Sequence, residues 1–105
     1  MAGVKPAPSV RDDAEHHRFV VEQDGAVAFL DYRREPGRLI LIHTETPAQL
    51  EGHGVGTALV RHALDVARAE RLTVVPWCPF ARGWMRRHMD QLGDLDVDWK
   101  TPPPH

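Results

Sequence analysis

The stretch Glu51-Gly52-His53-Gly54-Val55-Gly56-Thr57 decides the fold, because it separates a strand pattern from a helix pattern. Before it, residues 38–46 contain the apolar run 39–42, which predicts a central strand buried on both faces. After it, residues 55–70 repeat apolar side chains at helical spacing. Glycines allow a tight turn, and the first N–H groups of a helix have no internal partner. The stretch therefore favours an anion-binding turn, with a simple glycine-rich helix start as the alternative.

Two further strands precede the glycine stretch. Residues 19–23 and 26–33 are apolar runs separated by Asp24-Gly25, which predicts a two-residue hairpin turn. A second turn at Pro36-Gly37 leads into the strand at 38–46. We therefore expect three antiparallel strands before the helix.

A fourth strand and a second helix follow. Residues 72–77 are rich in β-branched side chains, and Pro79 suits the first position of a helix that reaches His88. A strand, helix and strand in succession predict a parallel pair. The fold class is α+β, a mixed sheet in the order β-β-β-α-β-α with a long helix after the glycine loop.

Length and charge limit the class of protein. The chain has 105 residues, enough for one domain, and its formal net charge is −2. We interpret residues 1–14 as a flexible leader, 15–92 as the domain and 93–105 as a proline-rich, extended tail. The near-neutral charge argues against nucleic-acid binding, and no apolar run is long enough for a membrane span.

The single cysteine, Cys78, excludes an internal disulfide and argues against a thiolate metal site. The seven histidines lack metal-ligand spacing, so we predict no metal. With no apolar segment typical of a secretory signal, the sequence predicts a cytoplasmic protein.

A resemblance covers roughly residues 18–88. The glycine stretch, together with residues 43–47 and Val75-Pro76-Trp77-Cys78-Pro79-Phe80, resembles the short YjdJ-like members of the GNAT superfamily of N-acetyltransferases. Against the superfamily motif, Gly54 and Gly56 occupy the glycine positions, and Glu51 stands where Arg or Gln is usual. The resemblance implies a minimal acyltransferase that uses acetyl-CoA as co-substrate.

The resemblance also implies how acetyl-CoA is held. The pyrophosphate would bind the glycine loop. The pantetheine arm would pair with the end of the strand before the loop, where that strand separates from the strand that follows the helix. The implied binding residues are Thr44, Glu45, Thr46, Gly52, His53, Gly54, Val55, Gly56 and Thr57. Glu51 places an acid near the pyrophosphate, which His53 and Arg61 would partly offset.

Three side chains are candidates for the chemistry. Cys78 precedes Pro79, so we expect it at a helix N-cap, a position that stabilises thiolate anions. It would accept the acetyl group covalently or assist a direct transfer; the alternative is a buried packing role. His43 and Glu45 are two residues apart on one strand face, so either is a candidate base, with structural or solvent-exposed roles as alternatives.

The function predicted is acetyl transfer to a primary amine of a small molecule or protein. The alternative is a non-catalytic CoA-binding sensor or interaction module, because the short N-terminal half leaves few residues for an acceptor site. We expect a monomer or a homodimer.

Overall fold

The hairpin predicted at Asp24-Gly25 joins β2 (Arg18–Gln23) to β3 (Ala26–Glu35) in a computed structural model that describes residues 8–104. Asp24 and Gly25 have φ values of 51° and 76°. Two positive φ values in a two-residue loop match the twist of the flanking strands, so the hairpin is closed by its own turn residues. Gly37, with a φ of 73°, then turns the chain into β4 (Arg38–Glu45).

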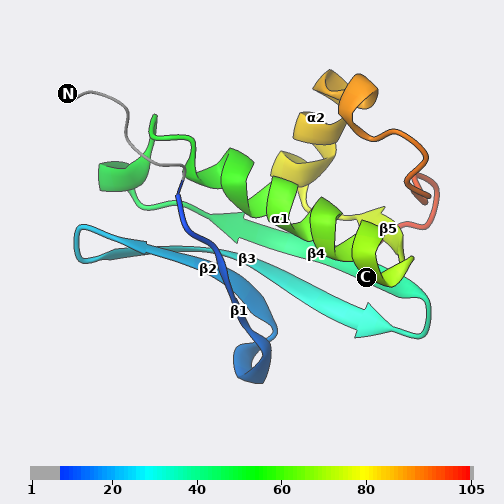
Figure 1. The fold of residues 1–105 in the computed structure, drawn as a ribbon, viewed down its shortest axis with the longest axis horizontal. Helices are drawn as coiled ribbons and strands as arrows, with labels where there is room; N and C mark the ends of the chain where they lie inside the picture. The colour runs from blue at the N-terminus through cyan, green and yellow to red at the C-terminus, as the bar shows by residue number, and fades with distance from the viewer. Residues whose placement is uncertain (1–7, 105) are drawn as a thin grey trace.

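The crossover unit is also as predicted. Helix α1 (Val55–Glu70) links β4 to β5 (Thr73–Pro76), and these two strands are parallel neighbours. Helix α2 (Pro79–Arg87) follows, with Pro79 in its first turn. Short 3₁₀ helices lie at Ala14–His16, Ala48–Leu50 and Met89–Gln91. The sheet runs in the order β1-β2-β3-β4-β5, where β1 is Arg11–Asp13 (Figure 1).

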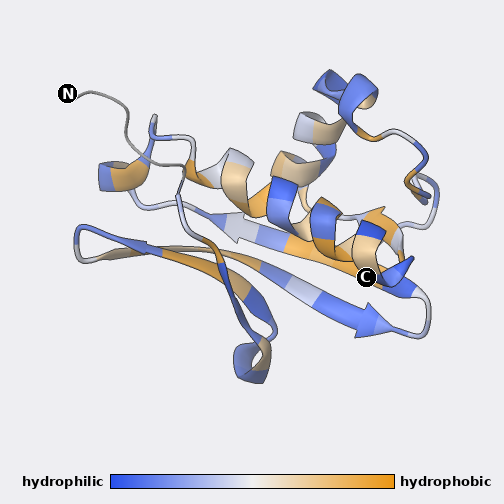
Figure 2. Cartoon of the chain, viewed as in Figure 1, coloured by the Kyte–Doolittle hydropathy of each residue, from blue (hydrophilic) through white to orange (hydrophobic). Residues whose placement is uncertain are grey.

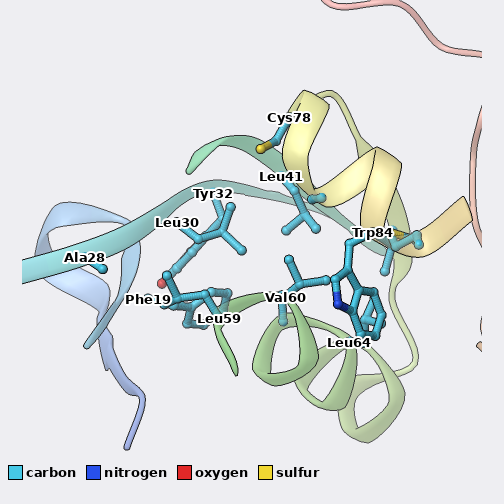
Figure 3. Close-up of a cluster of buried hydrophobic side chains, with 14 of the residues drawn as sticks. Phe19, Ala28, Leu30, Tyr32, Leu41, Leu59, Val60, Leu64, Cys78 and Trp84 are labelled. Carbon is cyan, nitrogen blue, oxygen red and sulfur yellow. The ribbon is translucent and has the colours of Figure 1, made fainter. Parts of the chain in front are cut away.

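One core joins both helices to one face of the sheet. It includes Leu41 of β4, Leu59 and Leu64 of α1, and Trp84 of α2, and all four are buried (Figure 3). Apolar residues dominate the middle of β4 and β5, whereas the last residues of β4 are hydrophilic (Figure 2). The hydrophilic strand end is therefore available for something other than packing.

A bulge in β4 determines which side chains face this core. Asp31 pairs with His43 and Tyr32 pairs with Leu41, so Ile42 is the extra residue. A bulge shifts the alternation of side chains by one residue. As a result Thr44, opposite the core residue Leu30, shares the helix-covered face with Leu41. Ile42 is 40% exposed, so the prediction that the whole run 39–42 is buried on both faces was wrong at its last residue.

Both flanks differ from the sequence prediction. The leader was expected to be loose, but Arg11–Asp13 forms β1, antiparallel to β2. Residues 1–7 of that predicted leader, like residue 105 of the tail, lie outside the described residues. The tail is not free, because Val97 forms a parallel bridge with Val74 of β5. Neither flank has the periodicity from which such pairing could be predicted.

Within residues 8–104, no helix combines the length and the apolar character needed to cross a membrane.

Candidate functional site

The glycine stretch forms the predicted turn into α1. Gly52 and Gly54 have φ values of 79° and 74°, in the left-handed region that favours glycine, and Gly54 is the N-cap. The first helical hydrogen bond runs from the Ala58 N–H to the Gly54 carbonyl, at 3.0 Å. The N–H groups of the three residues before Ala58 therefore have no helical partner, and the positive end of the helix dipole lies at the same place.

A cavity of about 410 Å³ opens at this helix start. It is bounded by the end of β4, the loop after it, the first turn of α1 and one residue of α2. Its lining consists of Thr44, Thr46, Leu50, Glu51, Gly52, Gly54, Val55, Gly56, Thr57 and Phe80. A polar strand end and a free helix N-terminus thus face one hollow, an arrangement suited to a ligand with an anionic group and an extended arm.

Most residues predicted to bind acetyl-CoA meet at this cavity. Of the nine, seven line it, and Glu45 and His53 do not. Both of these residues are exposed. The structure brings the predicted residues together but contains no ligand, so their role in binding stays a prediction.

Sequence reasoning did not assign Leu50 and Phe80 to this lining, whereas it placed Glu51 near the pyrophosphate. Glu51 is exposed and is the only charged residue among those that line the cavity. Phe80 is 42% exposed, and a Cβ placed on Gly56 would lie only 2.7 Å from its ring. Gly56 therefore allows the Phe80 ring to lie directly against the first turn of α1. The one signal in the sequence was an aromatic residue immediately after Cys78-Pro79.

Strands β4 and β5 separate next to the cavity. Their pairing extends from Arg38 opposite Thr73 to Leu41 opposite Pro76. One more bond follows, from the Cys78 N–H to the Leu41 carbonyl at 2.8 Å, and the chain then enters α2. The remainder of β4, from Ile42 to Glu45, continues without β5 beside it. This gives β4 a free edge at the predicted place.

Cys78 lies at the point where β4 and β5 separate. It is the N-cap of α2, as predicted, and lies close to Leu41 (Figure 3). Its side chain is 1% exposed, and its Sγ lies 3.1 Å from Thr44 Oγ1. Because Thr44 also lines the cavity, it connects the buried thiol to the hollow.

The two candidate bases lie on the other face of β4. His43 Nε2 is 3.5 Å from Glu45 Oε1, and both side chains are more than half exposed. The His43 ring approaches Phe29 of β3, with ring centroids 6.2 Å apart. His43 and Glu45 are therefore together, as the alternation predicted, but the strand backbone separates them from Thr44 and Cys78.

A second hollow of about 430 Å³ adjoins the first. The two share Gly54 and Thr57, and the second adds Arg61 and His62 one turn further along α1. The Arg61 guanidinium donates to Gln91 Oε1 at 3.2 Å and lies over the Trp84 ring. Among the described residues no carboxylate forms an ion pair with Arg61 within 4 Å, although Asp65, which is paired with Arg68, also lines this hollow.

One cluster of possible metal ligands lies away from these hollows. The ligand atoms of Asp13, Glu15 and His16 lie within 4.8 Å of one another near β1. His16 Nδ1 lies 2.9 Å from Asp13 Oδ2, and this contact accounts for the proximity of those two side chains. The prediction of no metal is not tested by this geometry.

The chain was compared with models of known protein families. The sequence model of the family described as GCN5-related N-acetyl-transferase matches residues 18–95, from β2 to the turn after α2. No curated protein matches the chain. The matched region includes the glycine turn, the free edge of β4 and Cys78, but neither β1 nor the segment after residue 95.

Proposed function

The chain belongs to the GCN5-related N-acetyl-transferase family, and we propose that it transfers an acetyl group from acetyl-CoA to a primary amine. The observation that carries this proposal is the single cavity shared by the helix start and the free edge of β4. A pyrophosphate fits the unpartnered N–H groups of residues 55–57. An extended pantetheine arm fits the β4 edge at residues 44–46, where strand-like hydrogen bonds are available.

The adjoining hollow suits the nucleotide end of the same co-substrate. Arg61 contributes a positive charge there, one helical turn beyond Thr57, while Asp65 in the same lining is paired with Arg68. Glu51 opposes it from the cavity wall. The net attraction for the phosphates therefore comes from backbone dipoles and Arg61 rather than from an arginine in the glycine loop.

The reaction is an acyl substitution. The neutral amine nitrogen attacks the thioester carbonyl carbon, the C–S bond breaks, and CoA leaves as a thiolate that takes up the proton released by the amine. Glu45 or His43 would first take that proton from the amine nitrogen, directly or through a water, and then pass it to the departing thiolate. Since both lie on the face of β4 opposite the cavity, the amine would approach from their side and meet the thioester at the free strand edge.

Burial favours direct transfer over a covalent acetyl-cysteine. Cys78 Sγ would have to reach the thioester carbon, yet the side chain is 1% exposed and already contacts Thr44. We therefore assign Cys78 and Thr44 to the wall beneath the thioester. In this assignment the pair fixes the strand edge and does not act as a nucleophile.

The second candidate function is binding of CoA without turnover. It is favoured by the separation of His43 and Glu45 from the cavity, because no carboxylate or imidazole other than Glu51 lines it. This module would sense acetyl-CoA or pass it to a partner. The two functions share the cofactor site and differ only in the chemistry at the edge of β4.

The deciding experiment is a titration with acetyl-CoA followed by an amine screen. We expect shifts in the amide NMR signals of residues 44–57, acetylation of at least one amine, and no acetyl adduct in the intact mass. An adduct that disappears in Cys78→Ala would replace direct transfer by the covalent route. Shifts without acetylation of any amine would favour the binding module, and absence of shifts would refute both functions.

Glu51 gives a sharper test of the phosphate position. Glu51→Gln removes the one negative charge on the cavity wall, so we expect acetyl-CoA to bind about threefold more tightly at low ionic strength. Asp90→Asn is the matched control, because it neutralises an exposed carboxylate in the 3₁₀ helix after α2. Isothermal calorimetry measures both. Equal affinities for the two variants and the wild type would mean that the phosphates do not lie beside Glu51.

A further inference from the structure

Residues 96–101, which we term the C-terminal strap, lie beyond the region matched by the family model. The strap nevertheless packs on the core through Val97 and Trp99, which are partly buried. It is drawn in orange to red in Figure 1, where the chain returns from α2 to β5.

The strap begins as a short extra strand beside β5. The Val74 N–H donates to the Asp96 carbonyl at 2.9 Å, and the Asp98 N–H donates to the Val74 carbonyl at 2.8 Å. The next bond of this parallel ladder would need an N–H at position 76, and that residue is Pro76. The pairing therefore stops after one bridge, and the strap leaves the sheet edge.

Asp98 then bends the strap. Its Oδ1 accepts the backbone N–H groups of Lys100 and Thr101, at 2.9 and 3.0 Å. Its Oδ2 accepts the Thr101 hydroxyl and lies 3.3 Å from Arg38 Nη1 at the start of β4. A carboxylate with this many donors fixes the backbone of the turn.

The bend is hydrogen-bonded to one residue before Cys78 in the sequence and to one residue after it. The Trp77 indole N–H donates to the Thr101 carbonyl at 2.9 Å, and Trp77 directly precedes Cys78. Arg82 Nη2 donates to the Trp99 carbonyl at 3.2 Å. The Arg82 N–H itself makes the first helical bond of α2, to the Cys78 carbonyl at 2.9 Å.

A cation–π contact strengthens the second attachment. The guanidinium carbons of Arg82 and Arg86 lie 5.7 and 4.8 Å from the centre of the Trp99 ring. The strap thus holds the residue before Cys78 and the residue one turn after it, and both attachments act on the first turn of α2.

We propose that the C-terminal strap is a positioning element for the acyl-transfer centre, holding the first turn of α2 so that Cys78 stays packed against Thr44. The positioning residues are Trp99 of the strap and Trp77, which donates its indole N–H to the strap. They act through the α2 start and do not touch the reacting atoms. The catalytic consequence rests on the proposed function, whereas the protection of the thiol does not, so the two can be measured separately.

The test compares three variants of the full chain. Trp77→Phe keeps an aromatic ring but removes the N–H that reaches Thr101. Trp99→Ala removes the ring under Arg82 and Arg86. Lys100→Ala is the matched control, because Lys100 lies in the strap but contributes its backbone N–H, not its side chain, to the Asp98 turn.

The first readout is the rate of Cys78 alkylation by iodoacetamide without acetyl-CoA, at a temperature where thermal melts show every variant folded. A buried thiol reacts through local opening, so loss of one hydrogen bond raises the rate about fivefold in Trp77→Phe. We expect about tenfold or more in Trp99→Ala, which loses stacking and packing. Lys100→Ala should match the wild type.

The second readout is acyl transfer to an amine found in the screen. We expect kcat to fall about threefold or more in Trp77→Phe and Trp99→Ala, with KM for acetyl-CoA changed less than about twofold, because the strap does not line the cofactor cavity.

The two readouts can contradict the proposal separately. Wild-type alkylation rates in both tryptophan variants would overturn the proposal. Faster alkylation with unchanged kcat would overturn the positioning role. If the wild type transfers no acetyl group at all, the proposed function fails and the alkylation rates still decide whether the strap holds α2.

Discussion

The sheet is extended at both of its edges, and the two extensions have different neighbours. At one edge β1 pairs with β2, and at the other the C-terminal strap bridges to β5. Both lie outside residues 18–95, where the family model matches. Each covers an edge that would otherwise expose unpaired backbone groups, which is a common requirement for a small sheet.

The contacts of the two extensions differ in kind. β1 makes a regular antiparallel ladder, from Arg11 opposite Val20 to Asp13 opposite Arg18. Asp12 Oδ1 accepts the Tyr32 hydroxyl at 2.6 Å, which ties β1 to the core face of β3. The strap makes one bridge and then attaches to Trp77 and Arg82. β1 therefore supports the sheet as a whole, whereas the strap supports the residues around Cys78.

Deleting each extension gives the largest contrast. A chain without residues 96–105 loses both attachments beside Cys78, so we expect alkylation to accelerate and acyl transfer to fall by about tenfold or more. A chain without residues 1–13 loses the β1 ladder and the Asp12 bond, so its melting temperature falls. It also loses Pro8 and Val10 from the wall of the second hollow, so we expect KM for acetyl-CoA to rise while transfer per folded molecule at saturating acetyl-CoA stays within about twofold. Circular dichroism gives the folded fraction and a coupled assay gives the rate. An equal loss of acyl transfer in the two shortened chains would contradict the assignment of the strap, and not β1, to the residues around Cys78.

Acid should release the strap. Hydrogen bonds from the Thr101 hydroxyl, then from the Thr101 and Lys100 N–H groups, lower the pKa of Asp98 from 3.8 to about 2. A lowered carboxyl pKa gives a contribution to stability that is complete above the unfolded value of 3.8 and is lost as pH falls through about 2.

The indole N–H signal of Trp77, followed by NMR, reports this release. We expect it to keep its bonded position down to about pH 3 and to shift below that, and Asp98→Asn to show the released position at neutral pH. A Trp77 signal that shifts near pH 4 in the wild type would contradict the assignment of the turn to Asp98.

The sequence was sufficient for the features that depend on local signals. Asp24-Gly25 predicted its hairpin, and helical periodicity after Gly54 predicted α1 with its observed bounds. The parallel pair followed from the rule for strand-helix-strand units. Each of these signals lies within a few residues of the structure that it predicts.

The remaining features depend on residues far apart in the chain. β1 has only three residues, too few for a period, and its register comes from residues 18–20. The bulge at Ile42 depends on how β3 pairs with β4, and it decides that Thr44 rather than His43 meets Cys78. Phe80 reaches the cavity because Gly56, on the other helix, leaves room for its ring. The sequence therefore predicted most of the cavity wall but not the side chains that close it.

Alkali should act on β1 with the smallest effect. Burial, and then the hydrogen bond to Asp12, raises the pKa of Tyr32 above its ordinary value of 10.0, while Arg34 beside it acts in the opposite direction. A raised pKa gives a contribution to folding stability that is complete below pH 10.0, the ordinary pKa. That contribution is lost as pH rises through the pKa of Tyr32 in the folded protein. Tyr32→Phe removes this dependence and costs about 1 kcal/mol of unfolding free energy at pH 7, since Asp12 can be rehydrated. Urea melts at neutral pH and near pH 11 measure both quantities.

Tyr32→Phe also tests whether the two sheet edges are independent. Because Tyr32 contacts β1 and not the strap, we expect the rate of Cys78 alkylation in Tyr32→Phe at neutral pH to equal that of the wild type. An accelerated rate would mean that the two edges are coupled through the core.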